Sequence, residues 1–180
     1  LVRNTNTPFY HPYSIAGTFI LSLVTVSDMG CISDTFRRTI IVNDRPRADF
    51  TIASLNCLKD TFYFNHINPP GTFNITGYLW SFDDATTQTN IDARKKFTNS
   101  GVQNIRYRIF TAEGCTGDTT KQVIINPDPV SKPGILPTGC TNAPMLITDT
   151  SAVSSGTIVS WQYIFGDGNT LTRAVNTAFT

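Results

Sequence analysis

The sequence predicts an all-β protein built from repeated β-sandwich modules, and three observations support this prediction. Aromatic residues alternate at positions 78, 80 and 82, and again at 161, 163 and 165, each time before a tight acidic turn. Such alternation is typical of a core β-strand that runs into a turn. Similar stretches recur at a spacing near 84 residues, and no window shows the i, i+3, i+4 spacing of an amphipathic helix.

The repeat is visible in paired residues along the chain. The Gly-Cys pairs that end at Cys31 and Cys115 lie 84 positions apart, and Cys57 and Cys140 lie 83 positions apart. Repeats of this length indicate an array of similar domains. One module is therefore expected to contain roughly 84 residues.

The two ends of the chain show the phase of the repeat. Residues 1–10 align without gaps to residues 171–180, with five identities in ten positions and an offset of 170. We therefore expect residues 1–45 to be the C-terminal half of one module and residues 46–128 to be a complete module. Residues 129–180 are expected to be the N-terminal half of a further module. The chain is then expected to be cut from a longer protein.

Alternation and turn signals predict about seven short strands in the complete module. The clearest candidates are residues 48–53, 61–64, 75–82, 89–97, 103–110 and 119–125. In the fifth of these, Ile105, Tyr107 and Ile109 are expected to face inward, and Arg106 and Arg108 outward. We expect four aromatic residues inside the predicted strands to be core residues, with a carbohydrate platform as the alternative, namely Trp80, Phe82, Tyr107 and Phe110. About seven short strands without helices are the signature of an immunoglobulin-like sandwich. The Pro-rich stretches at 43–47 and 126–133 are expected to be semi-stiff linkers between modules.

Composition argues against several classes of function. Charged residues make up 15% of the chain and the net charge is +1, which gives no reason to expect binding to nucleic acid or to a membrane surface. No apolar run approaches the roughly 20 residues that a membrane-spanning helix needs. No leader with a basic and then an apolar segment is present either.

Two stretches resemble a known sequence motif. Residues 163–168 are Tyr-Ile-Phe-Gly-Asp-Gly, residues 80–85 are Trp-Ser-Phe-Asp-Asp-Ala, and residues 11–13 are His-Pro-Tyr. The chain resembles the PKD (polycystic kidney disease) repeat family, whose pattern is Trp-x-Phe-Gly-Asp-Gly, then His-x-Tyr and a Gly. It departs from the pattern by a Tyr for Trp at 163 and by the loss of both glycines at 83 and 85. The positions that carry the resemblance are Trp80, Phe82, Asp84, Tyr163, Phe165, Gly166, Asp167, Gly168, Tyr13, Gly17, Phe97 and Gly101.

The cysteine pattern narrows the resemblance to the tandem PKD arrays of Bacteroidetes cell-surface proteins, including gliding-motility adhesins. This resemblance implies a non-enzymatic, extracellular stalk that holds a distal binding region away from the cell. It implies neighbouring modules as partners, with surface polysaccharide or other cell-surface proteins as further candidates. Two alternatives are a carbohydrate-binding or polymer-binding accessory module of an exported hydrolase, and a fibre subunit that assembles by strand exchange.

The four cysteines carry the strongest chemical signal. Cys57 lies at the head of the second strand and Cys115 follows the alternating strand, so we expect a disulfide between them within the module. It would close a loop of about 58 residues and stabilise the fold by roughly 4 kcal/mol. Cys31 and Cys140 are expected to pair with cysteines outside this sequence. Buried thiols are the alternative, and the cysteines and histidines lack the short spacing of a metal site.

Acidic residues at the turns allow two interpretations. Asp83, Asp84 and Asp167 are weak candidates for calcium ligands, because hard cations prefer clustered oxygens. The other interpretation is ordinary turn chemistry, in which Asp84 or Asp167 accepts hydrogen bonds from backbone amides. His11 and His66 have no nucleophile motif beside them, and we expect both to be packing or surface residues. No catalytic residue and no cofactor is predicted.

Overall fold

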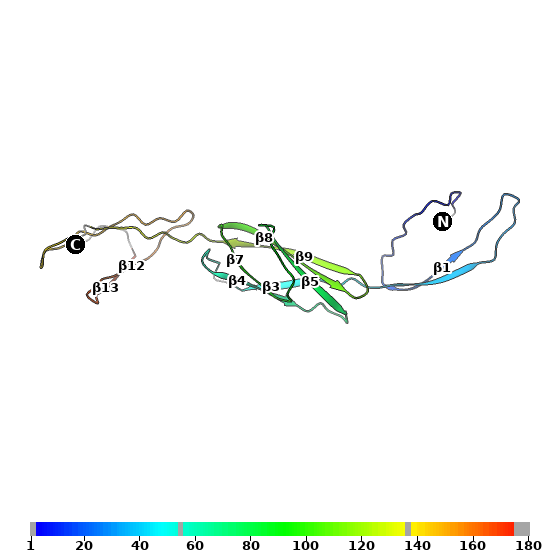
Figure 1. Cartoon of the computed structure of the whole chain (residues 1–180), viewed down its shortest axis with the longest axis horizontal. Helices are drawn as coiled ribbons and strands as arrows, with labels where there is room; N and C mark the ends of the chain where they lie inside the picture. The colour runs from blue at the N-terminus through cyan, green and yellow to red at the C-terminus, as the bar shows by residue number, and fades with distance from the viewer. Residues whose placement is uncertain (1–2, 54–55, 136–137, 175–180) are drawn as a thin grey trace.

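The structure is a computed structural model that describes residues 3–53, 56–135 and 138–174. Within these ranges the regular elements are all β-strands, as the sequence predicts. Figure 1 shows an elongated molecule in which a central sandwich lies between an N-terminal and a C-terminal segment. The similarity between residues 1–10 and 171–180 falls largely on residues outside the described ranges.

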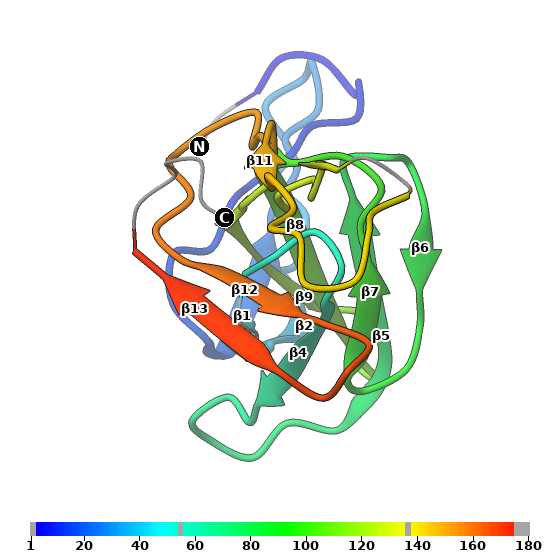
Figure 2. The same ribbon diagram turned by 90° about the vertical axis from the view of Figure 1, so that its left-hand side faces the viewer.

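The central sandwich spans residues 49–125 and has two antiparallel sheets. One sheet has the order β3-β4-β7, and the other has the order β6-β5-β8-β9. Figure 2 shows the molecule end on, with the strands crossing one another at an angle. The strands are β3 (Asp49–Ala53), β4 (Thr61–Ile67), β5 (Ile75–Phe82), β6 (Thr87–Gln88), β7 (Ala93–Lys96), β8 (Gly101–Thr111) and β9 (Thr116–Ile125). Seven strands in three-stranded and four-stranded sheets match the immunoglobulin-like sandwich expected for this part of the chain.

The core lies between the two sheets and follows the predicted alternation. In β8, Ile105, Tyr107 and Ile109 are fully buried, whereas Arg106 is exposed. The facing sheet contributes Phe50 from β3 and the phenylalanines of β4, so the core is dominated by aromatic rings. One expectation was wrong: Phe110 was assigned to the core with Tyr107. Because strand side chains alternate between faces, Phe110 lies on the outer face, against Gly77 of β5.

The N-terminal segment contains one hairpin, β1 (Gly17–Leu23) paired with β2 (Phe36–Val42). Its tip has the same geometry as the tip of the β8–β9 hairpin. In each tip the residue four before the cysteine, Ser27 or Thr111, donates its backbone N–H to the cysteine carbonyl. Its side-chain oxygen also accepts the N–H of Cys31 or Cys115 at 3.2 Å. The glycine before each cysteine has φ of 80° or 81°.

The two hairpins differ strongly in burial. Leu21 and Leu23 of β1 stand where Ile105 and Tyr107 stand in β8, but they are 49% and 55% exposed. Ile105 and Tyr107 are buried because the β3-β4-β7 sheet covers them, whereas the described part of the chain places no second sheet over β1 and β2. The N-terminal hairpin therefore presents an uncovered apolar face.

The C-terminal segment contains short strands that follow the order of the sandwich's first strands. They are β10 (Pro133–Gly134), β11 (Thr148–Asp149), β12 (Trp161–Ile164) and β13 (Thr170–Arg173). β10 pairs with β11, and β12 pairs with β13. The turn between β12 and β13 repeats the turn between β5 and β6, since the backbone N–H of Phe165 or Phe82 donates to the carbonyl four residues on. The described chain therefore repeats its sandwich hairpins before and after the sandwich.

Candidate functional site at the turns and ends of the sandwich

The aromatic strand of the predicted motif lies in the core. Trp80 is fully buried, and its indole N–H donates to the carbonyl of Asn90 at 3.0 Å. Its ring stacks on that of Tyr107, with centroids 4.0 Å apart. Phe82, two residues on, is also buried. These rings stabilise the packing of the two sheets and offer no free face to a ligand.

A hydrogen-bonded histidine lies at the edge of this core, and sequence reasoning did not anticipate its contacts. The Tyr107 hydroxyl is 2.7 Å from Nδ1 of His66, and Nε2 of His66 is 3.0 Å from Oδ1 of Asn68. Burial raises the pKa of the Tyr107 phenol, and the neighbouring Tyr78 and Asp92 raise it further. Both ring nitrogens of His66 are engaged, so its geometry fits a packing role rather than proton transfer to a substrate.

Four other motif residues lie at the start of the β1–β2 and β8–β9 hairpins. Phe97 is buried and packs edge-on against Phe62 at 5.1 Å between centroids. Gly101, with φ of 117°, then begins β8 in a conformation that side chains rarely adopt. In the N-terminal segment, Tyr13 packs against the ring of Phe19 at 4.6 Å, and Gly17 begins β1. These residues position the two hairpins.

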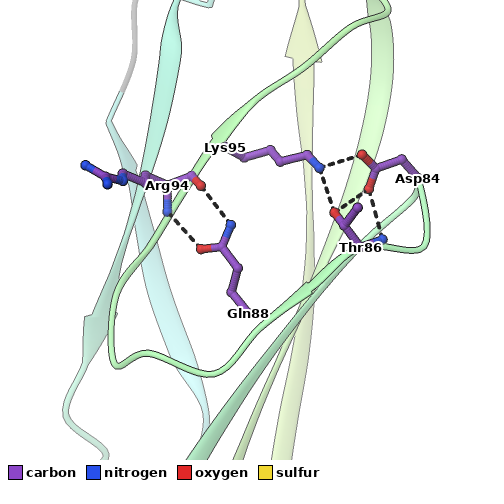
Figure 3. Close-up of polar contacts among 5 residues, drawn as sticks. All are labelled: Asp84, Thr86, Gln88, Arg94 and Lys95. Carbon is purple, nitrogen blue, oxygen red and sulfur yellow. Dashed lines mark hydrogen bonds and ion pairs between the residues drawn. The ribbon is translucent and has the colours of Figure 1, made fainter.

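The acidic turn after β5 is held by a local hydrogen-bond network, drawn in Figure 3. Oδ1 of Asp84 accepts the backbone N–H of Thr86 at 3.1 Å and its hydroxyl at 2.6 Å. Lys95 of β7 bonds to Oδ2 of Asp84 and to Oγ1 of Thr86. These bonds lower the pKa of Asp84 to about 2. The hydrogen bond from Lys95 contributes most, and the bonds from Thr86 add to it. The expectation that Asp84 accepts backbone amides in the turn is confirmed.

Asp83 and Asp167 have separate partners. Oδ2 of Asp83 accepts the backbone N–H of Asn104 of β8 at 2.6 Å. Oδ1 of Asp167 accepts the N–H of Asn169 at 2.9 Å, and this bond lowers the pKa of Asp167. A calcium site needs several oxygens directed at one point, and the Lys95 ammonium already occupies one oxygen of Asp84. Calcium binding at these turns stays a prediction that this geometry does not favour.

The cysteines do not lie as the sequence suggested. Cys57 forms a parallel β-bridge with Asn126, immediately after β9 ends, whereas Cys115 immediately precedes the start of β9. A strand of ten residues separates its two ends by about 30 Å, and the Cα atoms of a disulfide lie no more than about 7 Å apart. The predicted bridge between Cys57 and Cys115 is therefore wrong. No disulfide joins any of the four cysteines, all of which fall in the described ranges.

The four cysteines occupy two equivalent pairs of positions. Cys31 lies exposed at the tip of the β1–β2 hairpin, and Cys115, which is half-buried, lies at the tip of β8–β9. Cys140 is exposed between β10 and β11, as Cys57 lies between β3 and β4. The partners that the sequence predicts for Cys31 and Cys140 lie outside this chain and stay a prediction.

A shallow depression lies on the outer face of β4 and β7. Its wall includes the ring of Tyr63, which is 51% exposed. Around it lie Ala93 and five polar or charged residues, namely Asn65, Gln88, Asn90, Asp92 and Arg94. Gln88 is held by two hydrogen bonds to the backbone of Arg94, so this surface is partly ordered (Figure 3). Sequence reasoning missed it because its residues come from separate strands and loops.

Comparison with known structures gives a likeness of fold. No family model and no curated protein matches the chain. The PKD1 domain of Vibrio anguillarum Epp is similar to it in structure, with a TM-score of 0.42 and 17% sequence identity. The similarity covers 46% of this chain and 95% of that domain. No helix in the described residues is long and apolar enough to cross a membrane.

Proposed function

We propose that this chain is a structural segment of a long, repetitive extracellular filament. In this proposal β-sandwich modules follow one another and hold a distal binding region away from the cell. The resemblance to the PKD arrays of Bacteroidetes surface and gliding-motility adhesins supports a cell-surface location. The partners would be the neighbouring modules, together with surface polysaccharide or other cell-surface proteins. The chain itself would carry out no catalysis.

One observation carries the proposal. The inner face of the β1–β2 hairpin is half-exposed at Leu21 and Leu23, whereas the same positions of the β8–β9 hairpin are fully buried. Soluble proteins rarely leave a row of large apolar residues uncovered without a partner. β3 and β4, which cover β8 and β9, have counterparts in β10 and β11, which follow the sandwich along the chain. In an array, a segment like residues 129–180 would be followed by a segment like residues 1–45 and would cover its apolar face. Every such apolar face would then be buried.

The sandwich is suited to transmit force along the filament. The chain enters it near Pro46, beside the β8–β9 tip, and leaves it at Asn126, at the opposite end of β9. Ten residue pairs join β8 to β9 in one antiparallel ladder. Force applied between these ends runs parallel to the strands, so the hydrogen bonds are loaded together in shear. The elongated outline in Figure 1 agrees with modules that follow one another along a line.

Small-angle X-ray scattering of a fusion protein tests the array. In this fusion, residues 1–170 are followed directly by residues 1–180, which preserves the phase of the repeat. The fusion adds two modules, and each should contribute roughly the length of β8, which has 11 residues. We therefore expect the maximum dimension to exceed that of the single chain by about 70 Å. A compact particle whose maximum dimension stays near that of the single chain would contradict the proposal.

The depression at Tyr63 favours a second candidate function, polysaccharide binding by an accessory module. An exposed aromatic ring surrounded by amide, carboxylate and guanidinium groups offers both stacking and hydrogen bonds to a sugar. A glycan array with the intact chain, compared with Tyr63→Ala, tests this candidate. Tyr10, an exposed tyrosine outside the depression, supplies the control Tyr10→Ala. If Tyr63→Ala binds the glycans as well as Tyr10→Ala does, the depression is excluded as a binding site.

Strand exchange between separate chains is the third candidate. Residues 129–180 of one chain would cover the β1–β2 hairpin of the next, and a head-to-tail fibre would form. The uncovered face of β1–β2 supports this candidate as well. Sedimentation velocity of the 180-residue chain at increasing concentration tests it. A particle size that grows without limit as the concentration rises would support exchange between chains. A monomer at every concentration would exclude such exchange and leave the array within one long chain as the proposal.

A further inference from the structure

The tip of the β8–β9 hairpin rests against the end of the segment that precedes the sandwich. Sγ of Cys115 lies 3.9 Å from the carbonyl oxygen of Asn43, the residue directly after β2. Nearby, a Cβ at Gly117 would come within 1.8 Å of the carbonyl oxygen of Pro46, so backbone meets backbone there. The hairpin-tip cysteine is therefore placed at the junction with the preceding segment.

Cys57 is placed at the opposite junction. It forms a β-bridge with Asn126, the residue directly after β9. The carbonyl oxygen of Asn126 accepts the N–H of Leu58 at 2.9 Å, and its N–H donates to the carbonyl of Asn56 at 2.7 Å. These bonds fix the backbone around Cys57 against the residue that ends the sandwich.

Asn43 and Asn126 are equivalent positions. Each directly follows the second strand of a hairpin, and the residue before each pairs with the glycine that begins the first strand. The asparagine that ends one module thus contacts two cysteine-bearing segments. In its own module it contacts the loop that carries the first cysteine, as Asn126 contacts Cys57. In the following module it contacts the hairpin tip, as Asn43 contacts Cys115.

We infer that disulfides join successive modules and that none forms within a module. Cys57 is bonded to the hairpin-tip cysteine of the module that follows, which is Cys31 of the next repeat. Cys140 is likewise bonded to Cys115 of the next repeat. This inference rests on the proposed array of modules. It gives each of the four cysteines one partner and places one covalent link beside each Pro-rich linker.

The bond forms by ordinary thiol–disulfide exchange. A thiolate of one cysteine attacks a small-molecule disulfide and releases one thiol, which leaves a mixed disulfide on the protein. The second cysteine, as its thiolate, attacks the sulfur of this mixed disulfide that is attached to the protein, and a second small-molecule thiol leaves. The two cysteines together lose two protons and two electrons, and the small-molecule disulfide takes them up. Such bonds persist in oxidising, exported environments, in agreement with the proposed location.

The fusion of residues 1–170 to residues 1–180 tests the pairing, because it contains two complete junctions of the repeat. After equilibration with oxidised and reduced glutathione, cysteines that remain thiols are alkylated and the peptides are mapped by mass spectrometry. We expect two crosslinked peptides. One joins Cys57 of the first copy to Cys31 of the second copy, and the other joins Cys140 of the first copy to Cys115 of the second copy. The other four cysteines should be alkylated.

The same substitution in either copy supplies a matched control. Cys57→Ser in the first copy should remove one crosslink and leave Cys31 of the second copy alkylated. Cys57→Ser in the second copy should leave both crosslinks unchanged. A crosslink between Cys57 and Cys115 of one copy, or full alkylation of all the cysteines, would overturn the inference.

Hydrogen exchange on the same fusion separates this inference from the proposed function. If the array is correct, the amides of β1 and β2 in the second copy exchange at least tenfold more slowly than those in the first copy, with or without disulfides. Slow exchange combined with wrong or absent crosslinks would overturn the disulfide inference alone. Equal exchange in the two copies would overturn the array, and the disulfide inference with it.

Discussion

The indole of Trp80 and the phenol of Tyr107 stack at the centre of the sandwich, with their planes only 23° from parallel. The two residues are direct partners in the β5–β8 ladder, so cross-strand pairing sets their distance. The Tyr107 hydroxyl continues from this stack to Nδ1 of His66. The pair thus joins the buried core to a hydrogen bond at its edge.

Two substitutions at Tyr107 separate these contributions. Tyr107→Phe keeps the stacked ring and leaves His66 Nδ1 without its 2.7 Å partner, so we expect a loss of about 1–2 kcal/mol in the free energy of unfolding. Tyr107→Leu also removes the ring and should cost about 3 kcal/mol or more. Urea denaturation of both variants measures the difference. Equal losses would mean that the ring contributes nothing beyond the hydroxyl.

The acidic turn after β5 should make stability depend on pH in acid. The pKa of Asp84 is about 2 in the folded chain, below the value of about 3.9 for an unfolded aspartate. Because the folded pKa is the lower one, this stabilisation is fully present above about pH 4 and is lost as the pH falls through 2. We expect Asp84→Asn to lose about 0.5–1 kcal/mol at pH 7, since the carboxylate is largely exposed, and to show a weaker dependence on pH between 4 and 2.

The control for this prediction is Asp118→Asn. It removes an ion pair to Arg106 that is exposed on both sides and lies outside the turn. Thermal unfolding of each variant from pH 7 to pH 2 measures the effect. The interpretation of Asp84 fails if Asp84→Asn shows the same acid dependence as the unsubstituted chain.

The fold could be predicted from sequence to the level of strands and faces. The alternation of Ile105, Tyr107 and Ile109 located one buried face, because a strand repeats every two residues and the partner sheet accepts only apolar side chains there. Phe110 was assigned to the same face although an odd spacing places it on the other. The short β6, with two residues, gave no signal, because two residues carry no periodicity.

The cysteine pairing could not be predicted, for a geometric reason. The sequence locates Cys57 and Cys115 next to strands but does not say at which end of the sandwich each strand begins. Ten residues of β9 then separate the two cysteines. The depression at Tyr63 and the hydrogen bond of His66 were also missed, since both depend on which strands become neighbours.

Leu23 provides a test of whether the N-terminal hairpin is covered in a longer array. In the single chain Leu23 is 55% exposed, so Leu23→Ala should change stability by less than about 0.5 kcal/mol. In the second copy of the fusion, the same change should destabilise the module made from both copies by about 2–4 kcal/mol, because the side chain would then be buried. Ile20→Ala, on the opposite face of β1, is the control and should have little effect in either protein. Equal small effects of Leu23→Ala in both proteins would mean that nothing covers this face.

Gly117 gives the sharpest prediction about how closely the linker and the sandwich pack. A Cβ at this position would lie 1.8 Å from the carbonyl oxygen of Pro46 and 2.9 Å from its carbonyl carbon, and neither backbone atom can move without shifting the linker. Gly117→Ala should therefore destabilise the sandwich by about 1–3 kcal/mol and speed hydrogen exchange at the start of β3. Gly77→Ala is the matched control, because a Cβ there would meet only the side chain of Phe110, at an ordinary 3.6 Å or more. Ser33 stands at the matching position of the β1–β2 hairpin, so in the proposed array a linker that met this hairpin would need more room. Unchanged stability and exchange in Gly117→Ala would show that the linker does not pack against β9 in solution.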